Sequence, residues 1–353
     1  MTISRRYTLI TPRADRTGPT NVAVDIGRAA AAAGWDTRLL YLSGEPSRED
    51  LGSFAEVRRW RLRDIWELDG VIHTHCLRPD LVGWLFTWNP RCTVMTTLHN
   101  YFSIDLGFDH DRCAVRLAWF LWSRALRRFA HRVCISVTMC RYYHRQLPSL
   151  RFDLAYNFRA RFAAPSVELS LHLRAWFESQ RARRQLVLVY VGSLSPRKNV
   201  ASLLDALAEI PEISLVLCGA GPEAAQLRAS AMRSNLFERV LFAGQVADPD
   251  EIIRHSDLLV LPSLAEGLPL AVLEAARAGR PSLMSNIAVH RELAGLGFGA
   301  TFDRHRFTDF RATAHALAGE PSCPPDPRLF KLWEEHYSAA PGFEQYAKLV
   351  GAS

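Results

Sequence analysis

The sequence predicts an α/β protein made of two doubly wound domains, each built around a parallel sheet. Strand-like apolar runs alternate with helical segments, as in successive βαβ units. The alternation stops once, over 154–170, and then restarts. The chain has 353 residues, which is enough for two such domains. We therefore expect one domain over 1–159, a second over 160–327, and a terminal helix over 328–353.

The elements of the first half follow this apolar pattern. The runs expected to be strands are 7–12, 36–42, 71–75, 93–99 and 132–137. The helices expected between them include 20–34, which ends at a glycine, 79–88 and 113–130.

The second half repeats the pattern with more strongly apolar strands. The expected strands are 186–192, 213–219, 239–244, 258–263 and 281–286. Runs that are apolar on both sides are typical of strands covered by helices on both faces. Ligands of such open sheets bind beyond the carboxyl ends of the strands, so we expect a cleft between the strand ends of the two domains.

Composition narrows the class of protein. Hydrophobic residues make up 48% and charged residues 22% of the chain, as in soluble globular proteins. No apolar run of about 18 residues predicts a membrane span, and the N-terminus lacks the apolar core of a signal peptide. The seven cysteines are scattered without a CxxC pair, which favours a cytosolic protein without a zinc site. The net charge of +7 suits polyanionic partners, but no nucleic-acid-binding motif is present, so nucleic acid is not an expected partner.

The stretch "RADRTGPTN" (13–21) joins the first expected strand to its helix. Gly18 allows close approach of the backbone to a ligand, and a helix N-terminus favours anions. Asn21 is a candidate on the acceptor side of the same site. The stretch is not GxGxxG, which argues against a dinucleotide site, and a plain turn is the alternative.

Three histidines lie on neighbouring expected strands. His73 and His75 share one face of a strand because side chains alternate with a period of two. His99 ends the next strand at the ligand-binding edge, where it can hydrogen-bond a sugar hydroxyl or a carbonyl. We interpret His73 as structural, His75 as an acceptor-side candidate and His99 as a site residue. No acidic or thiolate cluster completes a zinc site around them.

The stretch "VGSLSPRKNV" (191–200) places Arg197 and Lys198 at an expected helix start. Adjacent cations beside the positive end of a helix dipole can clamp a pyrophosphate. A solvated basic turn is the alternative, and the P-loop spacing is absent.

The stretch "EGLPLAVLEAARAG" (266–279) holds two glutamates in an otherwise apolar segment. Glu266 follows a buried strand, and Glu274 falls in the second turn of the next helix, which Pro269 is expected to begin. A buried carboxylate needs hydrogen-bond donors, and Glu274 can accept from the vicinal hydroxyls of a ribose. The backbone amides of Gly267 and Leu268 can face the same ligand. A structural salt bridge is the alternative for either glutamate.

Several stretches together resemble the retaining glycosyltransferase family 4. They are "VGSLSPRKNV", "LVLCGAGPE", "VLFAGQV", "SDLLVLPSLAEGLPLAVLEAARAGRPSLMSN" and "TLHN". The resemblance covers nearly the whole chain and is strongest over 186–295, where Glu266 and Glu274 match the family's Glu-x7-Glu signature. It implies the GT-B fold of two Rossmann-like domains, with the terminal helix crossing back to pack on the first domain.

The resemblance also implies roles for the residues singled out above. His99 and Glu266 would be catalytic, close to the transferred sugar, and Glu274 would bind the ribose of the donor. Family members often have arginine after the glycine of the "VG" turn, where this chain has Ser193, so Arg197 would supply that charge. The implied donor-binding set is Gly18, Arg197, Lys198, Gly267, Leu268 and Glu274.

The implied reaction is sugar transfer, with retained anomeric configuration, from a nucleotide diphosphate sugar to a glycan or a polyprenyl-diphosphate-linked acceptor of a bacterial surface polysaccharide. No metal is expected, because the look-alikes of a DxD motif, "DHD" (109–111) and "DPD" (248–250), do not follow buried strands. "DPD" is expected to cap a helix. The stretch 114–132 combines Trp119, Phe120 and Trp122 with arginines, so we expect a cytoplasmic enzyme that binds an anionic membrane surface peripherally.

Other classes remain open at this point. An epimerase or hydrolase of the same fold would turn over a nucleotide sugar without an acceptor. A dehydrogenase is disfavoured by the missing GxGxxG, and an inactive binding module is disfavoured by the glutamates and the Arg-Lys pair.

Overall fold

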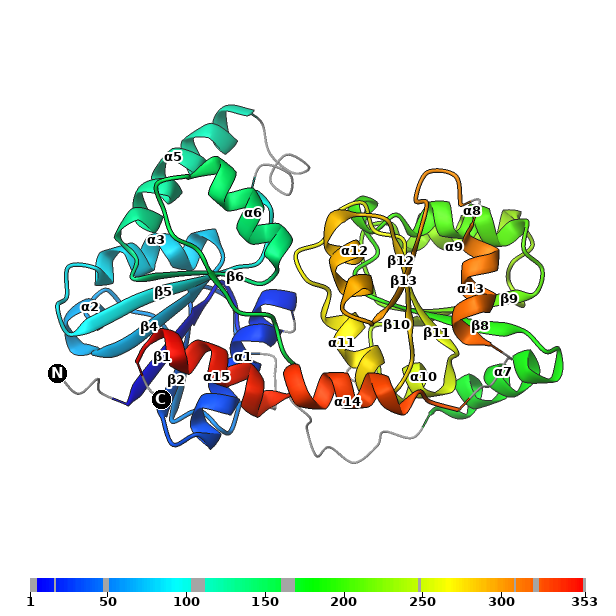
Figure 1. Ribbon diagram of the computed structural model, residues 1–353, viewed down its shortest axis with the longest axis horizontal. Coiled ribbons are helices and arrows are strands. Elements are labelled where there is room, and N and C mark those ends of the chain that lie inside the picture. The colour runs from blue at the N-terminus through cyan, green and yellow to red at the C-terminus, as the bar shows by residue number, and fades with distance from the viewer. Residues whose placement is uncertain are drawn as a thin grey trace. The chain divides into compact units, whose positions relative to one another are not determined.

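The computed structural model describes residues 5–15, 17–46, 51–102, 112–159, 169–246, 249–307, 309–319 and 324–351. The chain divides into two compact units, residues 1–161 with 336–353, and residues 162–335. Each unit is a parallel sheet with helices on both sides (Figure 1). None of the helices in this described part of the chain combines the length and apolar character needed to cross a membrane.

The first unit has seven parallel strands in the order β3-β2-β1-β4-β5-β6-β7. The strands are β1 (Arg6–Thr11), β2 (Asp36–Tyr41), β3 (Glu56–Arg59), β4 (Gly70–His75), β5 (Cys92–Leu98), β6 (His131–Cys134) and β7 (Asp153–Leu154). The helices are α1 (Gly18–Ala32), α2 (Asp64–Glu67), α3 (Leu77–Phe86), α5 (Arg112–Arg128), α6 (Val137–Gln146) and α15 (Ala339–Leu349). The order reverses between β1 and β4, which makes the ends of these two strands the ligand-binding edge of a doubly wound sheet.

The second unit repeats this order with six strands, β10-β9-β8-β11-β12-β13. The strands are β8 (Leu186–Val191), β9 (Ile213–Cys218), β10 (Val240–Gly244), β11 (Leu258–Leu261), β12 (Ser282–Ser285) and β13 (Gly299–Phe302). The helices are α7 (Leu171–Ala182), η2 (Pro196–Lys198), α8 (Val200–Ala208), α9 (Ala224–Arg233), α10 (Asp250–His255), α11 (Leu270–Arg277), α12 (Ala288–Gly295), α13 (Phe310–Ala318) and α14 (Pro327–His336). Here the order reverses between β8 and β11.

The C-terminal segment differs from the single terminal helix expected over 328–353. It forms two helices, α14 and α15, separated at Tyr337 and Ser338. Pro341 lies in the first turn of α15, where its missing amide costs no helical hydrogen bond, so the proline marks a helix start. Most of α14 belongs to the second unit, whereas α15 packs on α1 in the first (Figure 1).

The core of each unit accounts for the apolar runs of the sequence. The inner strands β8, β9 and β11 are buried along nearly their whole length. In the first unit, Tyr346 of α15 is fully buried against His73 of β4, with ring centroids 5.5 Å apart. Burying aromatic side chains contributes strongly to packing, so α15 is an integral part of the first unit.

Candidate functional site

Two loops of the second unit meet where the strand order reverses. The loop after β8 carries Arg197 and Lys198, and the loop after β11 carries Glu266. The Leu264 amide donates to the Arg197 carbonyl at 2.8 Å, and the Arg197 guanidinium donates to the Ala265 carbonyl at 2.9 Å. These bonds fix the two loops side by side and bring the basic pair to Glu266.

Glu266 is buried at the centre of this arrangement. Its Oε1 accepts from Lys198 Nζ at 2.5 Å and from Ser263 Oγ at 2.7 Å, and its Oε2 lies 3.7 Å from Arg197. Burial alone raises the pKa of this carboxyl, but Lys198, Arg197 and His290 outweigh burial and lower the pKa to about 2. Glu266 is therefore ionised at neutral pH, and both predicted diphosphate-binding cations lie beside it.

The basic pair precedes a helix rather than beginning one. Arg197 and Lys198 belong to the short 3₁₀ turn η2, and Asn199 follows it in the left-handed region with φ 55° before α8 starts. Asn199 Nδ2 donates to the Pro262 carbonyl at 3.3 Å, which adds a third link between the two loops. The expectation of a helix start at Arg197 is corrected accordingly, because the turn bends the chain toward the β11 loop.

Glycines of the neighbouring loop hold the β8 loop in place. A Cβ at Gly221 would lie 2.2 Å from the Leu194 carbonyl oxygen, and one at Gly219 would lie 1.8 Å from that of Gly192. The Leu194 amide donates to the Ala220 carbonyl at 2.9 Å. Only glycine permits such close backbone packing, so these residues set the position of the turn that carries the cations.

Glu274 occupies the second turn of α11, as expected from the sequence, and its side chain is buried. Pro269 is the N-cap of α11 rather than its first residue, because its ψ of 118° is extended. In the part of the chain that the structure describes, the Gly267 amide donates to no other group, whereas Leu268 is buried and has partners. The start of α11 thus leaves the Gly267 donor available at the edge that carries Glu266.

Gly18 begins α1 at the corresponding edge of the first unit. A Cβ built on Gly18 would meet no atom within 4 Å. Asn21 lies in the next part of the same helix, where its amide donates to the Thr17 carbonyl at 2.8 Å and its side chain is half-buried. Among the residues that the structure describes, no close packing contact requires a glycine at position 18.

We therefore expect Gly18→Ala to fold normally and to weaken binding of a nucleoside diphosphate. The added methyl group meets open space in the free protein, and alanine is the better helix former. A phosphate placed against the backbone would clash with it. Thermal unfolding and diphosphate binding measured on the same preparation check this. A normal affinity would show that no ligand approaches this glycine.

Two of the three histidines form a buried hydrogen-bonded pair. His75 Nδ1 lies 2.8 Å from His99 Nε2, and their rings stack with centroids 5.1 Å apart. Burial lowers the pKa of His99 to about 3 and that of His75 well below its ordinary value, with the neighbouring histidines adding to the effect on His75. Both rings are neutral at physiological pH and act as hydrogen-bonding groups rather than cations.

His73 has the geometry of a structural histidine. Its Nδ1 lies 2.9 Å from the Tyr7 hydroxyl, and its Nε2 lies 2.8 Å from Thr97 Oγ1. Burial, with a smaller contribution from His99, lowers the pKa of His73 to about 3. Both ring nitrogens have protein partners, so His73 has no free position for a ligand.

The two acidic stretches that look like a metal-binding DxD motif, "DHD" and "DPD", are only partly within the described residues. "DHD" (109–111) and Asp248 lie outside the described residues. Asp250 is in the first turn of α10 and pairs with Arg277. The stretch "DPD" therefore begins a helix with an acidic first turn, as expected, with Pro249 as its N-cap and no side-chain cap from Pro249. Among the residues with described positions, no group of three or more His, Cys, Asp or Glu side chains is placed to hold a metal ion.

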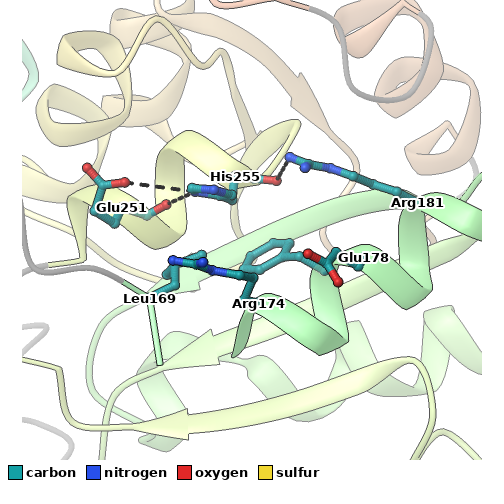
Figure 2. Close-up of a pocket in the computed structure, with 7 residues that line it drawn as sticks. Leu169, Arg174, Glu178, Arg181, Glu251 and His255 are labelled. Atoms are coloured by element: carbon teal, nitrogen blue, oxygen red, sulfur yellow. Dashed lines mark hydrogen bonds and ion pairs between the residues drawn. The ribbon is translucent and has the colours of Figure 1, made fainter. Parts of the chain in front are cut away.

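A hollow of about 240 Å³ lies between α7 and α10 (Figure 2). Phe177 is one of its lining residues, and the polar side chains around it are Arg174, Glu178, Arg181, Glu251 and His255. His255 ends α10 just before β11, at the amino ends of the strands. The hollow is therefore at the opposite edge of the sheet from Glu266 and is separate from the candidate site.

Three residues of this site were not predicted from the sequence. Ser263 donates to Glu266, Ser285 donates to the Ser263 carbonyl, and His290 is hydrogen-bonded to Ser285. Ser263 follows β11, Ser285 ends β12, and His290 lies in the first turn of α12. All three lie at the carboxyl edge of the second sheet, so the rule that located Glu266 could also have found them.

Comparison with known proteins finds similarity that is concentrated in the second unit. Residues 174–317 match the family model of the glycosyl transferases, group 1. The matched segment contains Arg197, Lys198, Glu266, Glu274 and His290. The O-antigen biosynthesis glycosyltransferase WclY of Escherichia coli is 25% identical over 239 residues, which is 63% of this chain and 63% of that protein.

A second relative is more similar over a shorter segment. The UDP-Gal:alpha-D-GlcNAc-diphosphoundecaprenol alpha-1,3-galactosyltransferase of Escherichia coli is 38% identical over 112 residues, 30% of this chain and 29% of that protein. The chain thus spans less than two thirds of the length of these curated relatives.

Solved structures share the fold along the whole chain. Anabaena HepE in complex with UDP-glucose has a TM-score of 0.75 at 17% identity, covering 99% of this chain and 100% of that one. Sucrose-phosphate synthase from Thermosynechococcus elongatus has a TM-score of 0.77 at 18% identity, with the same coverage. The predicted GT-B class, two doubly wound Rossmann-like domains, is confirmed.

Proposed function

We propose that this protein is a retaining glycosyltransferase that moves a sugar from a nucleotide diphosphate sugar to a glycan or polyprenyl-diphosphate-linked acceptor during surface-polysaccharide biosynthesis. The observation that supports this best is the buried, ionised Glu266, held between Lys198 and Arg197 at the ligand-binding edge of a group 1 glycosyl transferase segment. The relatives named for O-antigen and diphosphoundecaprenol chemistry support the acceptor class.

Each predicted site residue would act from the carboxyl edge of its own sheet. Glu274 would accept from the ribose hydroxyls, and the diphosphate would be held by Arg197, Lys198 and the backbone at Gly18 and Gly267. His99 would contact the transferred sugar, and Asn21 and His75 would lie toward the acceptor. Charged hydrogen bonds of this kind are the stronger ones in proteins, and they suit a dianionic diphosphate.

Retention follows if the acceptor attacks from the side that the diphosphate leaves. The bond from the anomeric carbon to the diphosphate oxygen breaks, the bond to the acceptor oxygen forms, and the acceptor proton passes to the departing diphosphate. Lys198 and Arg197 would stabilise the charge that develops on that leaving group, and ionised Glu266 would stabilise the positive sugar. Catalysis would then rest on positioning and electrostatics.

Transfer is expected to continue in EDTA. The basic pair and the helix starts would neutralise the diphosphate, which is the role that a divalent ion takes elsewhere. Rates with chelator, without chelator and with added Mn²⁺ check this. Complete loss in EDTA that Mn²⁺ restores would contradict the metal-independent mechanism.

A basic and partly aromatic surface on α5 supports the proposal of a membrane-linked acceptor. Helix α5 carries five arginines and no carboxylate, and Leu117 and Phe120 on its outer side are 61% and 51% exposed. Arg124 stacks on Phe120 at 4.4 Å, and Arg128 stacks on Trp88, which is 57% exposed just after α3, at 4.6 Å. We propose that this basic aromatic face, Trp88 with the outer side of α5, binds the anionic cytoplasmic face of the membrane.

Two of the aromatic residues assigned to this surface from the sequence point inward. Trp122 is buried, and its Nε1 donates to Asp80 at 2.6 Å. Trp119 is half-buried against Phe102, with ring centroids 4.9 Å apart. Only Phe120 of the three is exposed, and Trp88 and Leu117 take the places of the others.

A screen of nucleotide sugars with purified protein, read as released nucleoside diphosphate, tests the proposed activity. Release that requires an acceptor supports a transferase. Equal turnover without acceptor would favour an epimerase or hydrolase, and binding without turnover would favour an inactive module.

A further inference from the structure

His290 is a buried histidine whose tautomer the structure determines. Its Nδ1 lies 2.9 Å from the Ser285 carbonyl oxygen and 3.0 Å from Ser285 Oγ. A carbonyl oxygen can only accept, so Nδ1 carries the proton. The Ser285 hydroxyl in turn donates to the Ser263 carbonyl at 2.6 Å, which fixes its oxygen as a further acceptor for His290. The Nε2 of the neutral ring is therefore without a proton.

The unprotonated Nε2 of His290 has no hydrogen-bond donor beside it in the described part of the chain. It is fully buried, and no donor reaches it among the residues that the structure describes. A buried acceptor left unsatisfied is costly, and native structures rarely retain one without a function. His290 thus has an empty proton-accepting position inside the candidate site.

Two opposing charges act on this ring from the neighbouring loops. Burial is the largest effect and lowers the pKa of His290 to about 4; Glu266 and the Ser285 carbonyl raise it, and Lys198 lowers it further. The strand packed against α12 is β13, "GATF", which has no ionisable side chain. On the helix itself, Arg291 is held by the Asn286 carbonyl. On the loop after β13, Arg304 donates to the Leu264 carbonyl at 3.1 Å.

Lys198 has two roles that compete. It is the closest cation to Glu266, at 2.5 Å, and under the proposed function it also binds the diphosphate. Movement of its ammonium group toward a phosphate leaves the buried Glu266 carboxylate, among the residues with described positions, with Ser263 and the more distant Arg197. A buried carboxylate that loses its ion-pair partner is strongly unfavourable.

We propose that His290 takes up a proton on Nε2 when a diphosphate draws Lys198 away from Glu266, so that donor binding is coupled to protonation of a third residue in the site. The proton comes from solvent and replaces the charge that Lys198 provided beside Glu266. When the diphosphate leaves and Lys198 returns, the proton is released. His290 is a positioning residue in this scheme, because it acts through Glu266.

The coupling can be tested without any ligand. In Lys198→Met the lysine charge is absent while Glu266 remains, so the pKa of His290 should rise by about one unit or more. In Glu266→Gln the attraction is lost, and the pKa should fall. NMR titration of ¹³C-labelled histidine measures both values, with His290→Gln to assign the signal and Lys331→Met on α14 as the control. An unchanged or lowered pKa in Lys198→Met would overturn the proposal.

A second measurement uses uridine diphosphate as the probe and rests on the proposed function. The wild-type protein should bind more protons on taking up uridine diphosphate than His290→Gln does, by calorimetry in buffers of different ionisation enthalpy. Equal proton uptake in the two proteins would refute the coupling and leave the donor site intact. Failure of uridine diphosphate to bind would count against a uridine donor, while the NMR result on Lys198→Met would still decide the coupling.

Discussion

Replacing Lys198 or Glu274 by alanine is expected to weaken nucleoside diphosphate binding by roughly 10- to 150-fold. Each change removes one charge-assisted hydrogen bond, which contributes roughly 1.5–3 kcal/mol. At the carboxyl edge of the second sheet Glu274 is buried and the Lys198 side chain is 13% exposed, so solvent screens the contacts they make with a ligand only weakly. Calorimetric titration with uridine diphosphate measures the effect.

The control must separate lost binding from lost folding. Lys198→Ala leaves the Glu266 carboxylate buried without its nearest cation, which by itself destabilises the second domain. The double variant Lys198→Met, Glu266→Gln removes both charges and should recover much of the thermal stability without recovering binding. Lys331→Ala and Glu335→Ala, an exposed pair 3.7 Å apart on α14, serve as matched substitutions of the same residue types. Full affinity in both Lys198→Ala and Glu274→Ala would refute the site.

The fold was predictable because the sequences of its inner strands are compatible only with a sheet that is covered on both faces. A run such as "LVLVY" is apolar on every side and is stable only beneath helices on both faces. The edge strands β3 and β13 were missed because they lack this continuous apolar run. Strand β3, "EVRR", and strand β13, "GATF", are partly exposed and lack that signal, so hydrogen bonding to a neighbour defines them. Pro341 is a sequence signal for the start of α15, but the expectation of one terminal helix did not take this signal into account.

The sequence indicated which sheet edge carries the candidate site residues, but not which of their side chains form ion pairs with one another. Parallel strands bring their carboxyl ends to one edge, which places Arg197, Lys198 and Glu266 near each other whatever their side chains do. Whether the cations face solvent or neutralise the glutamate depends on loop contacts such as the Leu264 amide to the Arg197 carbonyl. No local pattern encodes that bond. The same holds for the hydrogen bond between His75, at the end of β4, and His99, which follows β5.

The surface of α5 shows a further limit of sequence patterns. Its arginines and aromatic residues indicate an amphipathic helix, but the pattern does not say which aromatic residues face out. The structure resolves this through Asp80, a buried carboxylate that accepts from Trp122 and draws it inward. Burial raises the pKa of Asp80 to about 7, against the effect of hydrogen bonds from Thr74, Thr96 and Trp122.

The triple variant Arg116→Gln, Arg124→Gln, Arg127→Gln is expected to bind anionic vesicles on the order of 100-fold more weakly than the wild type. All three arginines are exposed on α5, and each basic residue near an anionic membrane contributes about 1 kcal/mol. The matched control removes Arg233, Arg306 and Arg328, which are exposed on the second domain and change the net charge equally. Co-sedimentation with vesicles of anionic and of neutral lipid, at low and high salt, measures the binding.

The pattern across these conditions distinguishes a specific surface from a general effect of charge. A membrane-binding face at α5 requires strong binding to anionic lipid, loss in high salt, and a larger loss in the α5 variant than in the control. Equal losses in the two variants would show that only the net charge of +7 matters. Trp88→Ala then tests the apolar part of the face, because an indole inserted at the interface keeps its contribution in high salt while the arginines are screened. Negligible binding in every condition would leave a soluble acceptor as the substrate.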